Sequence, residues 1–483
     1  MSQKKSYYIT TTLPYVNADP HIGFASEIVI ADVLARYHAL CGEEVVFNTG
    51  TDEHGQKIYQ NALSLKMDPQ KYVDGYAAEF EKLKHLLNLS YTNFIRTTDL
   101  HHIKAAQELW KRVDQNGYIY KKEYAVKYCV GCELEKTDSE LVEGKCEFHP
   151  NKDLELIHEE NYFFRFSALG EKLLTLYKRY PDFVVPKKRF NEIRAFVERG
   201  LQDFSISRRK EKMPWGIPVP GDNEHVMYVW FDALTNYIST LGWPENEEMF
   251  EKFWGTAENP RAVQIAGKDN LRQQSAMWQA MLLAGGLPTS RKIGINGFIS
   301  VEGQKMSKSL GNVIAPSQMV ERFGVDGTRY LLLSKGYFGE DCDVIWEWFR
   351  EKYNADLANG LGNLVSRVIT LSSQEILVSF DEEKEDRSAL SPFDDFSLNI
   401  ILETIWEKIS DANKYIENYK PWELKKTDPE KFQEVMIHLL RELYRIADTL
   451  KAFLPETSEK IFLMLQTREK EILFSRIQSE KVI

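Results

Sequence analysis

The 483-residue sequence has no apolar run long enough to cross a bilayer, and its first residues, Met1 to Lys5, are polar. A membrane-spanning helix needs about 20 consecutive apolar residues, and a secretion signal carries an apolar core. We therefore expect a cytoplasmic protein without a membrane partner. Internal repeats and low-complexity tracts are also missing from the sequence.

Positive charge and cysteine are both scarce. The chain has 61 Lys and Arg against 72 Asp and Glu, a net charge of −11, which argues against indiscriminate binding of nucleic acid. A nucleic-acid partner would need a local basic surface on this acidic body. The 5 cysteines are an odd number, and Cys129, Cys132 and Cys146 are clustered, which favours a metal site over a disulfide framework.

What the sequence does have is the composition of a globular protein, with 43% hydrophobic and 28% charged residues. Its length predicts about three domains. Strand-like runs at 7–12 and 44–47 alternate with helical patterns at 28–40, 68–89 and 100–116. This alternation predicts an α/β fold with a Rossmann-type, doubly wound parallel sheet. We expect the sheet to be divided between residues 1–117 and 226–342, with a connective insertion at 118–225 and an all-helical domain at 343–483.

The run from Gly303 to Gly311 has the composition of a mobile phosphate clamp. Lys305 and Lys308 offer two cationic heads, Ser307 lies between them, and the two glycines allow the loop to move. Such a loop suits a polyphosphate whose charge must be stabilised during transfer. The alternative is a solvated loop without a ligand.

A second phosphate site is predicted at Asp19–Phe24, between the first strand and the first helix. The amino end of a helix directs backbone N–H groups and its dipole at a bound anion. His21 adds a donor there. A lone histidine in a loop is more often structural, so this motif by itself is weak.

Together the two motifs resemble the signatures of the class I aminoacyl-tRNA synthetases. Lys305–Ser309 spell KMSKS, and His21–Phe24 are similar to HIGH, with Phe24 in place of the second histidine. Among these enzymes, the methionyl-tRNA synthetases resemble the chain best, at Leu-Pro-Tyr-Val-Asn (13–17) and Gly-Thr-Asp-Glu-His-Gly (50–55). The resemblance makes His21, Lys305 and Lys308 catalytic and adds Gly23, Gly267, Asp269 and Ser307 to the ATP site.

The same resemblance implies a methionine pocket. Asp52 would hold the substrate ammonium, although it could also be a helix N-cap. The pocket positions implied by the family are Leu13, Tyr15, Asp52, Trp230, Ala233, Tyr237 and Gln274, of which Trp230 and Ala233 lie in a strand-like run, Met227–Ala233. An apolar, polarisable wall suits a thioether. The family commonly has histidine where this chain has Gln274 and isoleucine where it has Asn270.

Cys129-x-x-Cys132 and Cys146-x-x-His149 supply three thiolates and an imidazole. Four such ligands close a tetrahedral zinc shell without an open position, so we expect a structural zinc. Coincidental thiols in a surface loop are the alternative. The arrangement is similar to that of the single-zinc methionyl enzymes.

Beyond about Asp343 the sequence turns to helical periodicity. Asn363 and Arg367, four positions apart, and Trp422 match the residues with which the family reads the CAU anticodon. Their chemistry fits, because single-stranded bases are read by stacking and edge hydrogen bonds. They could instead be an exposed pair and a core tryptophan. The chain ends soon after this region, without the appended domain through which some relatives dimerise, so we expect a monomer.

The resemblance implies a methionine–tRNA ligase acting on L-methionine, ATP with Mg²⁺, and tRNA(Met). One alternative is a class I synthetase for valine, isoleucine, leucine or cysteine. Another is a non-catalytic tRNA-binding relative, which only Phe24, Asn270 and Gln274 support. We expect no protein nucleophile, because positioning and charge stabilisation suffice for phosphoryl and acyl transfer of this kind.

Overall fold

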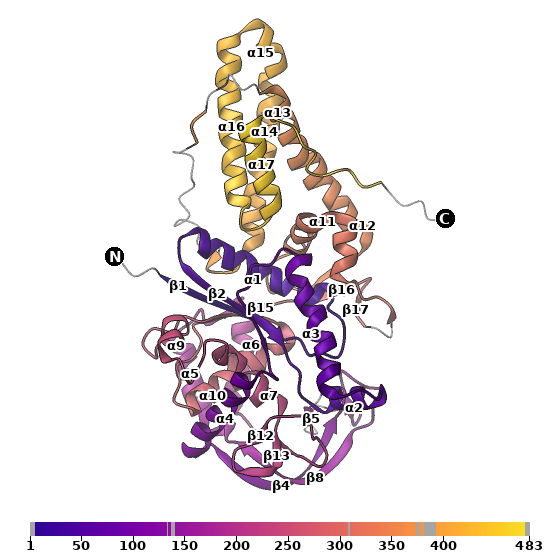
Figure 1. The fold of residues 1–483 in the computed structure, drawn as a ribbon, viewed down its shortest axis with the longest axis vertical. Helices are drawn as coiled ribbons and strands as arrows, with labels where there is room; N and C mark the ends of the chain where they lie inside the picture. Colours follow the sequence, from indigo (N-terminus) through magenta and orange to yellow (C-terminus); the bar gives the residue numbers. More distant parts are fainter. Residues whose placement is uncertain are drawn as a thin grey trace.

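The computed structural model describes residues 5–132, 134–136, 141–307, 310–372, 376, 378–380 and 393–478. An α/β body carries a long helical bundle at one end and a curved antiparallel hairpin at the other (Figure 1). None of the described helices combines the length and the apolar character that crossing a bilayer requires.

The body is built on a six-stranded parallel sheet with the order β3-β2-β1-β14-β15-β9. Its strands are β1 (Ser6–Thr11), β2 (Glu44–Thr51), β3 (Asn93–Arg96), β9 (Val184–Val185), β14 (Val263–Gly267) and β15 (Lys292–Asn296). The strand order reverses between β1 and β14, and ligands of open α/β sheets bind at the carboxyl ends of strands at such a point. The predicted fold class is confirmed.

Helices cover both faces of this sheet because successive strand residues point to opposite sides. Ile9 and Ile265 face one hydrophobic cluster and Tyr8 and Ala266 face the other. The first cluster contains α1 (Ile22–Leu40), α2 (Gln56–Ser64), α3 (Pro69–Leu86) and α11 (Pro316–Leu333). The second contains α4 (Leu100–Gln115), α5 (Gly170–Arg179), α6 (Lys187–Glu198), α9 (Glu247–Phe253) and α10 (Trp278–Ala284).

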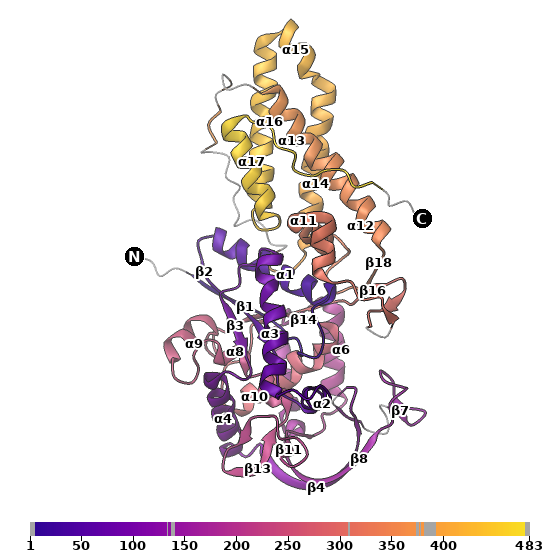
Figure 2. The same ribbon diagram turned by 45° about the vertical axis from the view of Figure 1, so that its right-hand side comes forward.

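The insertion is antiparallel. Its two long strands, β4 (Ile119–Cys129) and β8 (Glu155–Phe164), pair along their whole length and curve around the end of the body in Figure 2. Shorter strands complete it: β5 (Leu134–Lys136), β6 (Leu141–Val142), β7 (Lys145–Cys146), β10 (Phe204–Ser205), β11 (Ser207–Arg209), β12 (Pro218–Val219) and β13 (Asp222–Met227).

The strand-like reading of Met227–Ala233 is wrong. Strand β13 ends at Met227, and the chain continues as two short helices, α7 (Val229–Ala233) and α8 (Asn236–Ser239). The aromatic residues here have high β propensity, but tertiary packing overrides it. Phe231 N donates to the carbonyl of Tyr228 at 3.0 Å, and the Phe231 ring packs against Trp110 of α4 at 5.2 Å. Helix α1 also starts earlier than predicted.

A small three-stranded sheet precedes the C-terminal part and consists of β16 (Ile299–Val301), β17 (Gln304–Lys305) and β18 (Cys342–Val344). After β18 the chain is helical, as predicted. Its elements are α12 (Trp346–Lys352), η6 (Tyr353–Gly362), α13 (Asn363–Leu371), α14 (Leu398–Tyr419), α15 (Pro421–Thr427), α16 (Pro429–Leu450) and α17 (Pro455–Thr467). Their apolar faces join the same hydrophobic cluster as α1, so the bundle is packed onto the sheet body.

Candidate active site and metal centre

The two signature motifs meet at the amino end of α1. His21 caps this helix, and its Nδ1 accepts a hydrogen bond from Gly23 N at 3.0 Å. A Cβ atom on Gly23 would lie 2.7 Å from the His21 ring and 3.6 Å from Met306 Cε, so only glycine lets these parts approach. Burial lowers the pKa of His21; Asp269 opposes this effect and Lys305 adds to it. At neutral pH His21 is therefore an uncharged imidazole.

The clamp loop is held at its base. Asn312 Oδ1 accepts from Ser307 N at 2.8 Å, and Asn312 Nδ2 donates to the Lys305 carbonyl at 3.3 Å. The Lys305 ammonium lies 4.9 Å from the centre of the Phe298 ring. Gly303 and Gly311 have φ of 73° and 67°, a conformation that favours glycine. Lys308 lies outside the described residues.

Lys268, a neighbour of the predicted Gly267 and Asp269, approaches the same aromatic ring. Its ammonium lies 4.2 Å from the centre of the Phe298 ring, and it also pairs with Asp341. Lys268 and Asp269 belong to a short helical turn, η3 (Lys268–Asn270), directly after β14. The edge of the sheet next to the clamp loop thus carries two lysines and the Asp269 carboxylate.

Glu27 is a site residue that the sequence analysis missed. From the buried face of α1, its Oε1 accepts from Thr12 N at 2.8 Å and from Thr12 Oγ1 at 2.5 Å. The Gly267 amide also donates to Glu27, so the carboxyl joins the ends of β1 and β14. Burial raises its pKa to about 8. The sequence did carry one signal for it, because Glu27 is an acidic residue among the apolar residues of a helix that is buried in the protein.

Asp52 directly follows β2, and hydrogen bonds hold its backbone on both sides. Asp52 N donates to the Pro14 carbonyl at 3.0 Å, and Val16 N donates to the Asp52 carbonyl at 3.1 Å. Helix α2 is capped by Gly55, so Asp52 is not its N-cap. The adjacent Glu53 carboxylate accepts from Arg96 Nε at 2.6 Å and from Arg96 Nη2 at 3.0 Å.

Asp232, which sequence reasoning also missed, ties that loop to α7. Its carboxylate lies 2.6 Å from His54 Nδ1 and 2.8 Å from His102 Nε2, and its side chain is fully buried. Burial by itself would raise the pKa of Asp232, but the two histidines outweigh it and hold the pKa below its usual value. The loop of Asp52 and the helix of Trp230 and Ala233 are thereby joined.

Tyr237 completes this side of the site. Its hydroxyl accepts from Gln274 Nε2 at 2.5 Å, and it is buried with 2% exposure. Burial raises the pKa of Tyr237, and the charges of Glu27 and Asp52 raise it further, which places both carboxylates nearby. The remaining predicted pocket residues, Leu13, Tyr15, Trp230 and Ala233, are half-buried.

The four predicted metal ligands converge. Their ligand atoms all lie within 4.8 Å of one another, and Cys132 Sγ is 3.2 Å from Cys146 Sγ and 3.1 Å from His149 Nδ1. A tetrahedral zinc with bonds of about 2.3 Å needs ligand atoms about 3.7 Å apart, so the donor set and its size fit. A Cβ on Gly131 would lie 2.5 Å from the His149 ring, which explains a glycine inside the knuckle.

Of the three predicted anticodon residues, Asn363 and Arg367 belong to α13 and Trp422 to α15, the helix at the tip of the bundle (Figure 1). The Arg367 guanidinium is 5.8 Å from the centre of the Trp422 ring and pairs with Glu417 at 2.7 Å. Trp422 is 40% exposed, which contradicts a core tryptophan. Asn363 is exposed at the start of α13, one turn from Arg367.

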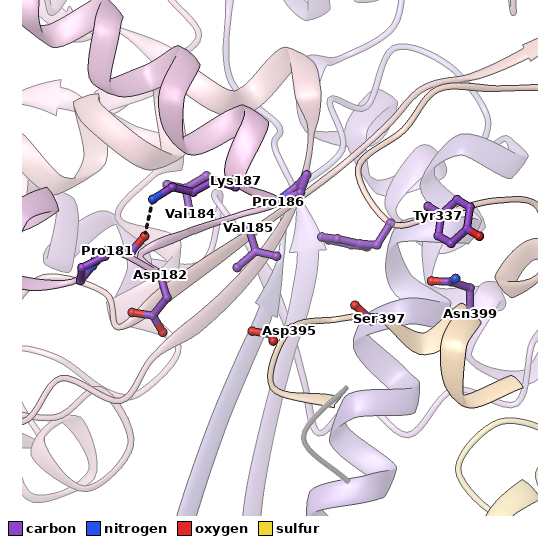
Figure 3. A pocket seen from close by; sticks show the side chains of 11 residues that line it. Pro181, Asp182, Val184, Val185, Pro186, Lys187, Tyr337, Asp395, Ser397 and Asn399 are labelled. Carbon is purple, nitrogen blue, oxygen red and sulfur yellow. Dashed lines mark hydrogen bonds between the residues drawn. The ribbon is translucent and has the colours of Figure 1, made fainter. Parts of the chain in front are cut away.

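A cavity of about 390 Å³ lies elsewhere, along the edge strand β9 (Figure 3). Val184, Val185 and Pro186 form one side of it, and Tyr337 and the start of α14 form the other. None of the predicted site residues that the structure describes lines this cavity.

Known proteins resemble the chain over nearly its whole length. A family model described as tRNA synthetases class I (M) matches residues 7–153 and 135–369. The methionine–tRNA ligase of Caldanaerobacter subterraneus is 40% identical over 99% of the chain and 80% of the relative. That of Thermotoga maritima is 41% identical, over 96% and 76%. The chain belongs to the class I methionyl-tRNA synthetases.

Solved structures agree with this membership. The methionyl-tRNA synthetase of Mycobacterium tuberculosis in complex with methionyl-adenylate has a TM-score of 0.87 and 35% identity, over 95% of this chain and 93% of that one. Its apo form has a TM-score of 0.80 and 31% identity, over 99% of both chains. Methionine–tRNA ligation is thus the activity of this enzyme, and synthetases for valine, isoleucine, leucine or cysteine are excluded.

Proposed function

We propose that the enzyme makes methionyl-adenylate at the carboxyl edge of the parallel sheet, between the amino end of α1 and the clamp loop. The methionine carboxylate attacks the α-phosphate of ATP, which arrives with Mg²⁺, and pyrophosphate leaves. The terminal ribose hydroxyl of tRNA(Met) then attacks the activated carbonyl. The supporting observation is the approach of the two motifs, in which Met306 Cε is 3.6 Å from the Cβ position of Gly23.

In this proposal each charge of the reacting groups has a counterpart in the chain. His21, Lys305 and Lys308 stabilise the phosphates as negative charge moves to pyrophosphate. Gly23, Gly267, Asp269 and Ser307 complete the ATP site. The neutral state of His21 supports a role as hydrogen-bond donor through its Nε2, because its Nδ1 already accepts from Gly23 N.

Asp52 holds the methionine ammonium, and the hydrogen bonds of its backbone support this role. Hydrogen bonds fix its backbone to Pro14 and Val16, so the carboxylate is positioned before substrate arrives. The substrate side chain lies among Leu13, Tyr15, Trp230, Ala233, Tyr237 and Gln274. Gln274 replaces the histidine common in the family and supplies an amide donor instead.

Cys129, Cys132, Cys146 and His149 hold one structural zinc, which keeps the insertion folded beside the active site. The closed Cys₃His donor set supports a metal without catalytic chemistry, since no coordination position is left for water.

The bundle reads the anticodon of tRNA(Met) with Asn363, Arg367 and Trp422. An exposed indole beside a guanidinium supports this role, because unstacked bases bind to such pairs. The working unit is a monomer in the cytoplasm, where its substrates are found. Its domains are 1–117 and 226–342 for catalysis, 118–225 for the insertion and 343–483 for anticodon binding.

Methionine-dependent exchange of pyrophosphate into ATP tests the first step without tRNA. We expect Lys305→Ala and Lys308→Ala each to lower kcat of exchange about 100-fold or more, as for loss of a transition-state contact. Lys111→Ala, on the exposed surface of α4, is the matched control and should exchange normally. Normal exchange by both clamp variants would refute the assignment.

A further inference from the structure

The cavity beside β9 lies at an open edge of the parallel sheet. β9 is the last strand in the order of this sheet, so β15 covers only one of its two edges. The cavity of about 390 Å³ separates the other edge from Tyr337 and the start of α14 (Figure 3). An uncovered strand edge is a template for pairing with another chain, because its backbone groups lack partners.

The pairing of β9 with β15 turns the backbone of Val184 toward the cavity. Ile293 N of β15 donates to the Phe183 carbonyl at 2.8 Å, and Ile293 pairs in register with Val184. Consecutive residues of a strand direct their backbone groups to opposite edges, so the N–H and the carbonyl of Val184 both point away from β15. Among the described residues neither group has a hydrogen-bond partner, although Val184 is only 1% exposed. Burying such groups is costly unless water or a ligand satisfies them.

A second unsatisfied donor lines the cavity from the opposite side. Asn399, in the first turn of α14, is 8% exposed, and within the part of the chain that the structure describes its Nδ2 has no hydrogen-bond partner. Figure 3 shows Asn399 on the same side of the cavity as Tyr337, opposite Val185. Unsatisfied polar groups therefore face the cavity from two separate elements, which is the arrangement of a ligand site.

The rest of the interior is apolar. Val185, Pro186 and Phe338 line it, and the ring of Tyr337 at its mouth is 59% exposed. An exposed aromatic ring beside an apolar interior is typical of surfaces that bind a partner.

Charged side chains line one rim of the cavity. Asp182 Oδ2 lies 2.9 Å from Arg291 Nη2 and 3.1 Å from Lys292 Nζ, so its charge is compensated. Asp395 is 70% exposed and lies 3.8 Å from the same Lys292, whose charge Asp182 already shares. Lys187, the one cation among the described lining residues, donates to a backbone carbonyl at 3.3 Å (Figure 3). Asp395 is therefore the lining carboxylate best placed to pair with a basic group.

We propose that this cavity binds an extended, basic segment of a partner protein, which adds to β9 as a further strand of the sheet. A residue of an extended chain presents one N–H and one carbonyl at the same edge, and these complement the carbonyl and the N–H of Val184. Every second side chain of the segment enters the apolar interior, because side chains alternate along a strand. A lysine or arginine of the segment pairs with Asp395.

Fluorescence anisotropy with labelled, blocked hexapeptides tests this proposal on the whole enzyme. We expect a peptide of alternating valine and lysine to bind. The same peptide methylated at every backbone nitrogen should bind at least tenfold more weakly, because it cannot donate to the strand edge. Amide hydrogen exchange at Val184 should become slower when the unmethylated peptide binds. The amide of Val185 is the internal control, because it faces β15.

Two substitutions assign the binding to this edge. Val184→Pro removes the free N–H but spares the bonds to β15, since an edge strand tolerates proline, and it should weaken binding. Asp395→Lys should weaken binding of the lysine peptide about fivefold, the factor that one exposed charge pair is worth, and should strengthen binding of a peptide of alternating valine and glutamate. A folding defect cannot change the two affinities in opposite directions. Asp411→Lys, at another exposed aspartate of the bundle, is the matched control and should change neither.

Three results would overturn the proposal. Equal binding of the methylated and unmethylated peptides would exclude strand addition, and binding of no peptide would exclude the site. Self-association of the enzyme that Asp395→Lys abolishes, measured by analytical ultracentrifugation, would assign this edge to a second copy of the chain.

Discussion

Replacing Arg329 by methionine should loosen the helical bundle from the catalytic body. Arg329 of α11 is fully buried, and its Nη2 lies 2.7 Å from the fully buried carboxylate of Asp32 on α1. Its guanidinium also donates to the carbonyls of Leu87 at 3.1 Å, Ala452 at 3.3 Å and Phe453 at 2.8 Å. One side chain thus joins α1, the end of α3 and the α16–α17 turn.

The size of the effect follows from burial. Removing one partner of a buried ion pair costs about 3–5 kcal/mol, because the other charge and its neighbours remain desolvated. Asp32 offers an internal comparison, since Arg36 lies 2.8 Å from the same carboxylate but is 20% exposed. Arg36 also donates to the Asn88 carbonyl at 2.6 Å, but its guanidinium is in part contact with solvent, and Arg329 still pairs with Asp32 when Arg36 is removed, so the loss of Arg36 should cost less. We therefore expect Arg329→Met to be much more destabilising than Arg36→Met.

Urea unfolding followed by circular dichroism measures the free energy of unfolding of both variants. Asp32→Asn and the double variant Asp32→Asn/Arg329→Met complete a double-mutant cycle for the buried pair. We also expect Arg329→Met to lower tRNA aminoacylation more than pyrophosphate exchange, because only the first reaction needs the bundle correctly oriented. A cost for Arg329→Met no greater than that for Arg36→Met would refute this reasoning.

Three further predictions concern the metal, a buried carboxyl and the bundle tip. Cys132→Ser should lose bound zinc, measured by elemental analysis, whereas exposed Cys41→Ser should retain it. Because the pKa of Glu27 is raised to about 8, the folded state holds a proton that the unfolded state releases, so stability should fall as pH rises from about 4.5 to 8. The melting temperature measured across this pH range should therefore fall less in Glu27→Gln than in the unchanged enzyme. Trp422→Ala should raise KM for tRNA about 10-fold or more, with exchange unchanged, as loss of one stacked base implies; Tyr337→Ala, also exposed, should not.

Much of the site could be predicted because its motifs are local. Cys129 and Cys132, like Cys146 and His149, are separated by a short turn that follows a strand, so their sequence spacing nearly determines their distance in space. The same holds for the helix start at His21, which needs only a strand, a turn and a helix. The clamp loop is equally local. Periodicity likewise predicts strands and helices that are several residues long.

Other site features could not be predicted, because they join distant parts of the chain. Asp232 and His54 are 178 positions apart, and their contact depends on how α7 packs against the loop after β2. The helix at Val229–Ala233 was itself read as strand, since its aromatic residues favour either structure and only their packing decides.

The sequence alone determined the family, the fold class, the Cys₃His cluster and the two motifs at His21 and at Lys305, because each of these is recognised from residue order within short windows. Tertiary structure alone decided that Glu27 joins β1 to β14, that Arg329 joins the bundle to the sheet, and that Gln264 Nε2 lies 3.3 Å from Gln274 Oε1. The physical reason is that a buried polar group must find a partner, and which partner lies within about 3 Å is settled only when the separate elements pack together.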